Sequence, residues 1–394
     1  MKILVICQYY YPEPFRIADI CEELVKKGDE VTVITGIPNY PMGEIYEGYK
    51  GKEKLDEVIN GVKVHRCYTI PRKKGIINRF LNYYSFSISS SIYVGKLKGK
   101  YDMVFVNQLS PIMMANAGLK YKKKNNTKLI LYCLDLWPES VCAGGIKEKS
   151  ILYKYFYRVS KKIYSNCDKI LVTSKSFIDY FKEKFNIDNK KIEYLPQYAE
   201  SIFKPEYCKK EKDNYLDLLF AGNIGKAQCV DKIIDAANLL KKENIKFHIV
   251  GDGSEYVSCI NKINELKLSN IKMYGREPIE KMPEYYKKAD ALIVTLCGDS
   301  IISYTLPGKV QSYMASGKPI IAMANGETKN VIEDAKCGFC GLADDVTEFV
   351  DNIKKFMNVE NKEKLGINSY KYYEENFNKE KFIIKLLNIF KEEI

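Results

Sequence analysis

The sequence lacks any apolar run of the roughly 18 residues that a membrane-spanning helix requires. Its first residues, MKILVICQYY, turn at once into Tyr and Pro. They show none of the basic head, long apolar stretch and small-residue cleavage site of a signal peptide. We therefore interpret this stretch as a buried first strand and expect the protein in the cytoplasm.

Histidine and closely spaced cysteines are also scarce. The two histidines, His65 and His248, stand far apart, and only Cys337 and Cys340 among the 12 cysteines form a CxxC pair. A structural zinc site needs a second pair of ligands at similar spacing. We therefore expect no metal and no cofactor, with inert cysteines that fill small buried spaces.

No G-x-G-x-x-G motif follows the first predicted strand, which argues against a dinucleotide oxidoreductase. The net charge of +12 would attract nucleic acid, anionic lipid or phosphorylated substrates alike. The basic runs lie on separate loops and do not interleave with stacking aromatics, so we expect no nucleic-acid partner. A basic binding or scaffold protein remains a less favoured alternative.

What the sequence does contain is two series of alternating strands and helices. The predicted strands of the first series are 2–7, 30–35, 62–67, 103–108, 128–136 and 169–174. Those of the second lie in the tracts 216–225, which ends in a glycine turn, 245–255, 271–276, 291–296 and 319–327. Residues 192–214 have no sustained periodicity and read as a linker, and the chain beyond about 360 reads as helical. The pattern predicts two Rossmann-like α/β domains with parallel sheets, 1–195 and 196–365, and C-terminal helices 366–394 packing back toward the first domain. Because such sheets bind ligands at the carboxyl ends of their strands, we expect the site in a cleft between the domains.

The tract SYTLPGKVQSYMASGKPII (303–321) is the most informative one. Thr305 is placed to cap a helix that starts at Leu306, Pro307 and Gly308, and Gly317 to end it. The free N–H groups of such a helix start suit a diphosphate, and Lys309 adds a full positive charge. A capped surface helix without a ligand is the alternative interpretation.

This tract resembles the family-4 glycosyltransferases of the GT-B fold, through YMASGKPII. The resemblance implies a donor nucleotide held by this helix, although the family's two glutamates are replaced by Tyr304 and Ser312, leaving ribose recognition to Ser312. FAGNIGKAQCVDKIIDAANLL (220–240) is similar to the family's glycine turn at Gly222. Asn223 and Gln228 replace the usual basic clamp, so Lys226 and Lys309 are expected to supply the charge. The resemblance further implies base or ribose contacts for Arg276 and contacts with donor hydroxyls for Glu327, with a capping role as the alternative for Glu327.

Four tracts of the first half narrow the resemblance to the WbuB-like branch: QYYYPEPFRIADICEELVKKG, VTVITGIPNYPMGEIYEGY, QLSPIMMANAG and YCLDLWPES. This implies a retaining transferase of O-antigen or capsule biosynthesis, moving an N-acetylated amino sugar from a UDP-sugar to a lipid-linked saccharide. Asp135 and Glu139 are the candidate catalytic carboxylates, Asp135 polarising an acceptor hydroxyl; capping of the next helix is the alternative. Glu13 and Arg16 are expected at the donor phosphate or the acceptor, and Asn39 in the acceptor pocket.

Residues 71–100 form a helix rich in Ile, Phe, Leu and Tyr, flanked by Arg72, Lys73, Lys74 and Arg79. Such a segment suits an anionic bilayer surface that carries a polyprenyl-diphosphate-linked acceptor. A core helix beside a solvated basic loop is the alternative. A non-hydrolysing sugar-nucleotide epimerase shares the expected fold, but it normally relies on several histidines that this chain lacks.

Overall fold

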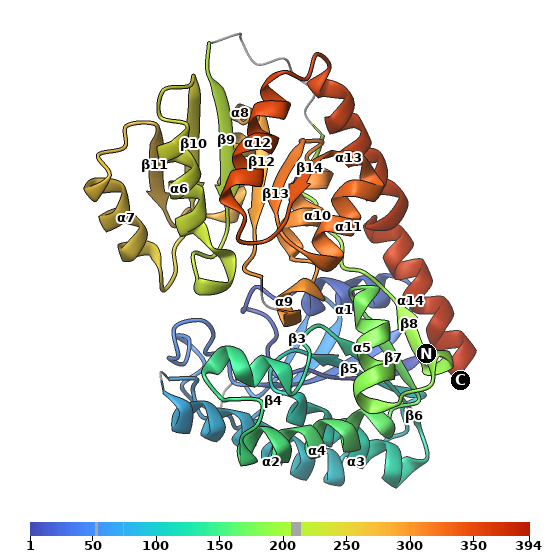
Figure 1. The fold of residues 1–394 in the computed structure, drawn as a ribbon. Coiled ribbons are helices and arrows are strands. Elements are labelled where there is room, and N and C mark those ends of the chain that lie inside the picture. The colour runs from blue at the N-terminus through green and yellow to red at the C-terminus, as the bar shows by residue number, and fades with distance from the viewer. Residues whose placement is uncertain (52–53, 74, 206–213, 299) are drawn as a thin grey trace. The chain divides into compact units, whose positions relative to one another are not determined.

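The computed structural model describes residues 1–51, 54–73, 75–205, 214–298 and 300–394, which form two compact units (Figure 1). The first comprises Met1–Thr173, Phe177–Leu195 and Ile383–Ile394; the second comprises Ser174–Ser176 and Pro196–Phe382. The chain passes from the first unit to the second mainly between Leu195 and Pro196. It returns to the first unit after Phe382, whereas the predicted boundary of the second domain was residue 365.

The first unit contains an eight-stranded sheet in the order β3-β4-β2-β1-β5-β6-β7-β8. The strands are β1 (Lys2–Ile6), β2 (Glu30–Gly36), β3 (Asp56–Ile59), β4 (Val62–Cys67), β5 (Met103–Gln108), β6 (Lys128–Cys133), β7 (Lys169–Val172) and β8 (Ile192–Tyr194). All six predicted strands of this half are present, and every neighbouring pair is parallel except β3 with β4. β5 is buried along its whole length, as expected for an apolar strand covered on both faces.

Two strands of this sheet were not predicted. β3 is a four-residue edge strand joined to β4 by Asn60 and Gly61, whose φ angles of +50° and +83° form the short hairpin turn that Asn-Gly favours. β8 has only three residues and lies within 192–214, so the prediction of a linker over the whole of that tract is wrong at its start.

The helices of the first unit are α1 (Ile17–Lys26), α2 (Ile76–Lys96), α3 (Ala115–Asn125), α4 (Ile151–Ser165) and α5 (Ser176–Phe185), together with the end of α14 (Lys379–Glu393). The end of α14 packs on this unit through Phe390, whose ring lies 5.3 Å from that of Phe105. An ion pair of 2.7 Å joins Lys385 to Glu193.

The second unit has a six-stranded parallel sheet in the order β11-β10-β9-β12-β13-β14. Its strands are β9 (Leu216–Ala221), β10 (Ile245–Val250), β11 (Ile271–Gly275), β12 (Ala291–Thr295), β13 (Ile320–Met323) and β14 (Gly338–Gly341). The first five match the prediction. β14, with the sequence GFCG, was missed because two of its four residues are glycine, a poor strand former.

Alternate residues of β9 define the two faces of this sheet. Leu218 and Phe220 pack with α6 (Val230–Leu239), α7 (Tyr256–Glu265) and α12 (Val346–Met357). Leu219 and Ala221 pack with α8 (Met282–Lys288), α10 (Gly308–Ala315), α11 (Gly326–Ala335) and α13 (Lys362–Asn376), while α9 (Ser300–Ser303) is a single turn. The strand order reverses between β9 and β12, and in the first sheet between β1 and β5. Ligands of doubly wound sheets bind beside these points, at the carboxyl ends of the strands.

The start of α10 differs from the prediction by two residues. Pro307 occupies its N-cap position with φ −69° and ψ 138°, and the helix begins at Gly308. Thr305 lies outside and donates its N–H to the carbonyl of Ile302 at 3.0 Å, so the prediction that Thr305 caps the helix is wrong. The predicted exit is confirmed, because Gly317 follows the C-cap Ser316 with a φ of +64°.

Candidate active site

In the second unit, the loop after β9 is held against the loop after β10. The N–H of Gly222 donates to Val250 O at 2.9 Å, and the N–H of Ile224 donates to Asp252 O at 2.9 Å. A Cβ on Gly251 would lie 1.8 Å from Gly222 O, and both glycines have φ angles near +140°. Glycine is therefore required for this close approach of two backbones, which leaves a cradle without side chains beside the point where the strand order reverses.

Lys309, in the first turn of α10, reaches this cradle. Its Nζ is buried and has no hydrogen-bond partner among the residues that the structure describes. It lies 3.6 Å from the centre of the Phe220 ring, and a Cβ on Gly222 would be 2.9 Å from it. Burial lowers the pKa of Lys309 from 10.5 to about 7, because the cation has lost water without gaining an anion. Together with the N–H groups that every helix start leaves unbonded, it forms a position suited to an anion.

The other predicted donor residues surround this cradle in different ways. Asn223 Nδ2 and the N–H of Gly225 both donate to Gln228 Oε1, at 3.1 and 3.2 Å, so the two amides close the loop between them. Lys226 and Arg276 are exposed, whereas Leu306 is buried. Ser312 is buried, and its hydroxyl donates to Gly308 O at 3.3 Å and to Glu200 Oε2 at 3.5 Å.

Glu327, at the start of α11, is buried, and its carboxylate binds backbone N–H groups of a segment far away in the sequence. Its two oxygens accept hydrogen bonds from the N–H groups of Lys175 at 3.0 Å and Ser176 at 3.2 Å, and from the Ser176 hydroxyl at 2.8 Å. These partners belong to the second unit. The side chain fixes that short segment, and its predicted contact with donor hydroxyls stays a prediction.

In the first unit, Glu13 joins the loops that follow β1 and β2. Its Oε1 accepts the N–H groups of Asn39 at 2.8 Å and Tyr40 at 2.7 Å, and its Oε2 accepts that of Tyr10 at 3.3 Å. Burial raises the pKa of Glu13 to about 7, against the three N–H groups that favour its charged form. Asn39 in turn accepts the N–H of Arg72 at 2.9 Å. Arg16 stands in the N-cap position of α1.

Asp135, two residues beyond β6, lies at the carboxyl edge of the same sheet. Its oxygens accept hydrogen bonds from the hydroxyls of Ser110 and of Ser140, the latter at 2.5 Å. Ser110 also accepts a hydrogen bond from the indole N–H of Trp137 at 2.8 Å. Burial raises the pKa of Asp135, and the two serines and the nearby charge of Arg72 oppose that rise. Ser110 comes from the loop after β5, so only the fold reveals it as a partner.

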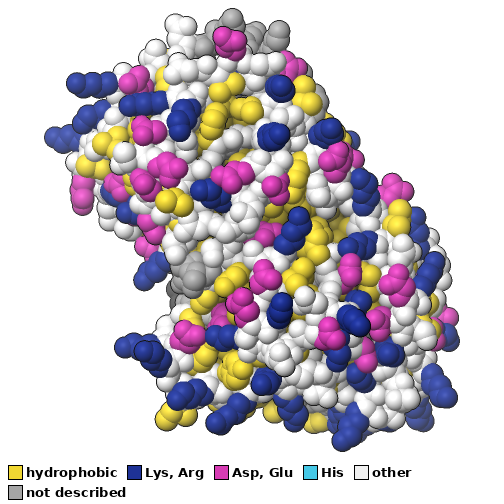
Figure 2. Space-filling view, turned by 45° about the vertical axis from the view of Figure 1, so that its right-hand side comes forward, with side chains coloured by type: hydrophobic (Ala, Val, Ile, Leu, Met, Phe, Trp, Pro, Cys, Tyr) yellow, Lys and Arg dark blue, Asp and Glu magenta, His cyan; other side chains and the backbone are white. Residues whose placement is uncertain are grey.

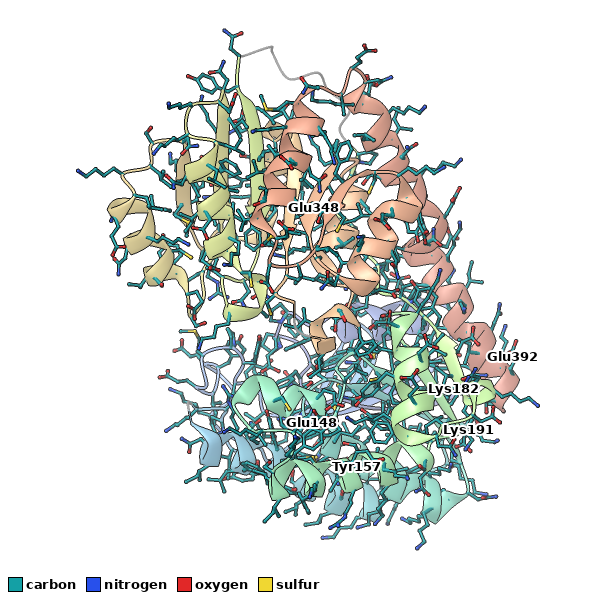
Figure 3. All side chains as sticks on the ribbon, in the orientation of Figure 1. Glu148, Tyr157, Lys182, Lys191, Glu348 and Glu392 are labelled. Carbon is teal, nitrogen blue, oxygen red and sulfur yellow. The ribbon has the colours of Figure 1, made fainter. Side chains whose placement is uncertain are left out.

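Glu139 faces a different network. It accepts hydrogen bonds from Tyr153 at 2.5 Å and Tyr180 at 2.9 Å, and its Oε1 lies 2.9 Å from Lys184 Nζ. Lys184 Nζ also lies 3.0 Å from Glu148 Oε1, and the backbone carbonyl of Lys184 accepts a hydrogen bond from the Tyr157 hydroxyl. Glu148 and Tyr157 are labelled in Figure 3. Asp135 and Glu139 are therefore close in sequence but belong to separate hydrogen-bond groups.

Comparison with known proteins gives the two halves a common interpretation. Residues 16–197 match the model of Glycosyltransferase Family 4, and residues 203–372 match the model of Glycosyl transferases group 1. Within the described residues, no group of three or more His, Cys, Asp or Glu side chains is placed to hold a metal ion.

Individual relatives agree with these domain matches. The putative colanic acid biosynthesis glycosyl transferase WcaI of Escherichia coli is 25% identical over 351 residues, which is 84% of each chain. The probable glycosyltransferase WbjE of Pseudomonas aeruginosa is 26% identical over 226 residues, 54% of this chain and 55% of WbjE, so that match spans about half of WbjE. Among solved structures, HepE of Anabaena in complex with UDP covers both chains completely with a TM-score of 0.73 at 13% identity.

Proposed function

Because the chain is a glycosyltransferase of the GT-B fold, with a family 4 domain followed by a group 1 domain, we propose that it moves a sugar from a UDP-sugar to a lipid-linked saccharide in surface-polysaccharide biosynthesis. The donor sugar we propose is an N-acetylated amino sugar. The observation that carries the proposal is the buried Lys309 ammonium beside the glycine cradle. The names of WcaI, a colanic acid enzyme, and HepE, solved with UDP-glucose, support the pathway and the nucleotide.

The proposed donor pose follows from the charges of the second unit. The diphosphate lies over Gly222 and the start of α10, where Lys309 and the helix N–H groups neutralise it. Asn223, Lys226 and Gln228 border it from the loop after β9. Arg276 borders the base, and Ser312 and Glu327 complete the ribose and sugar positions. Pro307 and Gly308 leave the helix start open to the phosphate, since neither carries a bulky polar side chain.

The chemistry we propose is transfer with retention of the anomeric configuration. The bond between the sugar C1 and the β-phosphate oxygen breaks, and a bond forms between C1 and the acceptor oxygen on the same face. The departing phosphate takes the acceptor proton. Asp135, held by two serine hydroxyls, polarises the acceptor hydroxyl, while Glu13, Arg16 and Asn39 shape the acceptor loops. Its contacts indicate that Glu139 positions the loop after β6.

We also propose that Lys309 replaces a divalent cation at the leaving diphosphate. Turnover is then unchanged when EDTA is added, and a loss of activity that Mg²⁺ or Mn²⁺ restores would overturn this part of the proposal.

A lipid-linked acceptor agrees with the surface of α2, α3 and α4, which contact one another within the first unit. None of their sequences contains Asp or Glu. Their basic residues are Arg79, Lys96, Lys120, Lys122, Lys123, Lys124, Lys154, Arg158, Lys161 and Lys162. In Figure 2, dark blue side chains lie along the lower rim of this unit. Lys122 is paired with Asp168 at 2.6 Å, and the remaining positive charges on the three helices favour an anionic bilayer.

Apolar side chains stand on the same helices. Ile77, Leu81, Ile88 and Ile92 of α2 are 76, 47, 57 and 52% exposed, at the spacing of one helical face. On α4, Ile151 is 87% exposed, and the Tyr155 hydroxyl lies 2.8 Å from that of Tyr84 on α2. No described helix is long and apolar enough to cross a membrane. We propose that this face rests on the bilayer surface, with Lys73 beside it; Lys74 lies outside the described residues.

Two experiments test the function. Thermal-shift measurements with UDP-, GDP- and dTDP-sugars should show the largest stabilisation with a UDP-sugar, and stabilisation by none of them would contradict the assignment.

Co-sedimentation with phosphatidylglycerol vesicles should be lost in the double variant Ile77→Ser, Ile88→Ser. It should be retained in Val257→Ser, a control that removes a 68% exposed side chain from the second unit. Equal binding by both variants would overturn the membrane face.

A further inference from the structure

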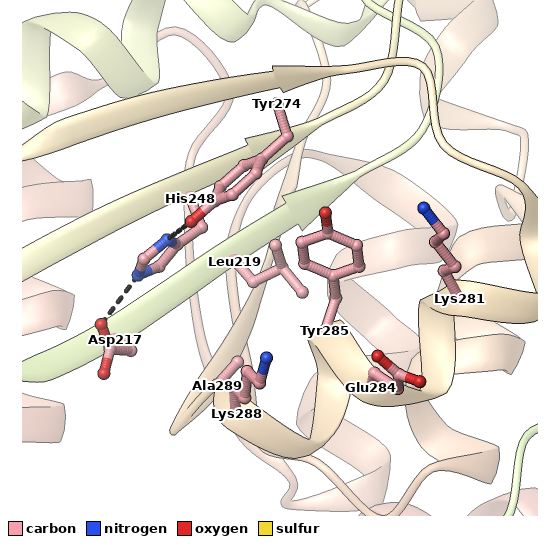
Figure 4. A pocket seen from close by; sticks show the side chains of 9 residues that line it. All are labelled: Asp217, Leu219, His248, Tyr274, Lys281, Glu284, Tyr285, Lys288 and Ala289. Carbon is pink, nitrogen blue, oxygen red and sulfur yellow. Dashed lines mark hydrogen bonds and ion pairs between the residues drawn. The ribbon is translucent and has the colours of Figure 1, made fainter.

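A pocket of about 440 Å³ opens on the face of the second sheet, next to α8 (Figure 4). Leu219 and Ala289 line its apolar part. Its polar side chains are Asp217, His248 and Tyr274 from the strands β9, β10 and β11, and Lys281, Glu284, Tyr285 and Lys288 from α8 and the turn before it. Asp217, the second residue of β9, marks its far end, whereas the glycine cradle follows the last residue of that strand. The pocket reaches Tyr274 near the carboxyl end of β11, but its lining shares no residue with the proposed donor site. Its volume is in the range of small-molecule sites.

A line of three polar groups crosses this pocket. His248 Nε2 lies 2.7 Å from Asp217 Oδ1, and His248 Nδ1 lies 2.9 Å from the Tyr274 hydroxyl. The three side chains come from three adjacent strands, so the rigid sheet fixes their spacing. Both ring nitrogens of His248 are used within the row, so a ligand meets the row at the Asp217 carboxylate, which accepts hydrogen bonds, and at the Tyr274 hydroxyl, which can donate or accept.

Tyr274, at one end of this line, forms a corner with the ring of Tyr285. The Tyr274 and Tyr285 ring centres are 5.3 Å apart at an interplanar angle of 73°. The Tyr285 hydroxyl donates to Glu277 Oε1 at 3.3 Å, which orients its ring from the rim of the pocket. Such a corner offers apolar ring faces to a flat, weakly polar ligand surface.

We propose that this pocket binds one neutral sugar ring of a glycan, as a holding site distinct from the transfer site. The lining disfavours other classes. The carboxylates of Asp217 and Glu284 are matched by the ammonium groups of Lys281 and Lys288, so the lining offers no net positive charge to a nucleotide diphosphate. An alkyl chain would strip water from these charged groups without replacing its hydrogen bonds. A sugar ring places its C–H face on the tyrosines and its hydroxyls on the polar line.

The two histidines of the chain supply a direct test. The enzyme is titrated with methyl β-D-glucoside, methyl β-D-galactoside and N-acetyl-D-glucosamine, and the imidazole C–H signals are followed by NMR, with His65→Gln used for assignment. We expect at least one sugar to shift the His248 signal with a millimolar dissociation constant, about −4 kcal/mol. The His65 signal should stay in place, and UDP should leave His248 unshifted. No shift of His248 with any of these sugars would overturn the proposal.

Variants separate this site from the transfer site. Tyr285→Ala should weaken sugar binding at least about fivefold, Tyr285→Phe should keep it, and Tyr215→Ala, a tyrosine outside the pocket, should be without effect. Lys309→Ala should weaken UDP binding and retain the shift of His248. Sugar binding that survives Tyr285→Ala would place the sugar elsewhere and contradict the proposal, whatever the outcome for UDP.

Discussion

The carboxyl edges of the two sheets differ in how their charges are satisfied. In the first unit, Glu13, Asp135 and Glu139 each accept several hydrogen bonds from nearby N–H and O–H groups. In the second unit, Lys309 Nζ is buried with no hydrogen-bond partner in the described part of the chain. An edge whose carboxylates are already hydrogen-bonded within the protein suits a neutral hydroxyl acceptor, because these carboxylates keep their hydrogen bonds when the acceptor leaves. A buried cation suits an anion that restores its charge.

The difference agrees with the proposed division of the two substrates between the two units. Oriented carboxylates in the first unit have hydrogen-bond capacity for a hydroxyl but would repel a diphosphate. The helix start, glycine cradle and ammonium of the second unit favour a diphosphate. Each prediction below alters one side of this comparison.

Asp135→Asn should have the largest effect. The amide oxygen can still accept from one serine hydroxyl, and the amide nitrogen can donate to the other, but the side chain no longer carries the charge that we propose polarises an acceptor hydroxyl. We expect kcat to fall by about 10² to 10⁴ with unchanged affinity for the UDP-sugar, measured by steady-state kinetics and by direct binding. A wild-type kcat would remove Asp135 from the mechanism.

Lys309→Ala should lower the affinity for UDP by about 10- to 100-fold, the usual cost of one charged hydrogen bond. Lys309→Arg should retain most of the affinity, because it keeps the charge. Lys226→Ala should have a smaller effect than Lys309→Ala, since Lys226 is exposed and screened by solvent. Isothermal titration of UDP into the three variants measures this order. Equal losses of UDP affinity in Lys309→Ala and Lys226→Ala would contradict the proposal that Lys309 is the main cation of the diphosphate site.

Gly222→Ala should weaken UDP binding by about tenfold. The added Cβ would lie 2.9 Å from Lys309 Nζ and would displace the ammonium. Gly99→Ala is the matched control, since Gly99 also has a positive φ, +103°, but has nothing within 4 Å of the added Cβ. A wild-type UDP affinity in Gly222→Ala, or an equal loss in Gly99→Ala, would contradict the displaced cation as the cause.

Glu13→Gln should mainly affect stability. The amide nitrogen cannot accept a hydrogen bond, so one of the three N–H groups that Glu13 now binds stays unpaired. We expect the first unit to lose about 1–3 kcal/mol of unfolding free energy, measured by chemical denaturation. UDP affinity should stay unchanged, because Glu13 belongs to the other unit. A fall in UDP affinity with unchanged stability would contradict this separation.

Features that are encoded within a short stretch of sequence could be predicted, and features that depend on residues far apart in the sequence could not. The long apolar strands, the glycine turn at Gly222 and the helix carrying Lys309 are local patterns, and all were found. β3, β8 and β14 have three or four residues each, too few for a periodicity to show. The contacts of Ser110 with Asp135 and of Glu13 with Asn39 join residues about 25 positions apart, so only the fold brings them together. Sequence proximity likewise suggested one site for Asp135 and Glu139, which face separate networks.

The most direct test of the central claim is proton uptake on UDP binding. With a pKa of about 7, Lys309 is mostly neutral at pH 8, and an adjacent diphosphate raises that pKa. UDP affinity should therefore fall by up to about tenfold per pH unit above pH 7. Calorimetry at pH 8 in two buffers of different ionisation enthalpy should show uptake of up to one proton in the wild type and none in Lys309→Arg. Identical proton uptake in both proteins, or no binding of UDP at all, would contradict the account.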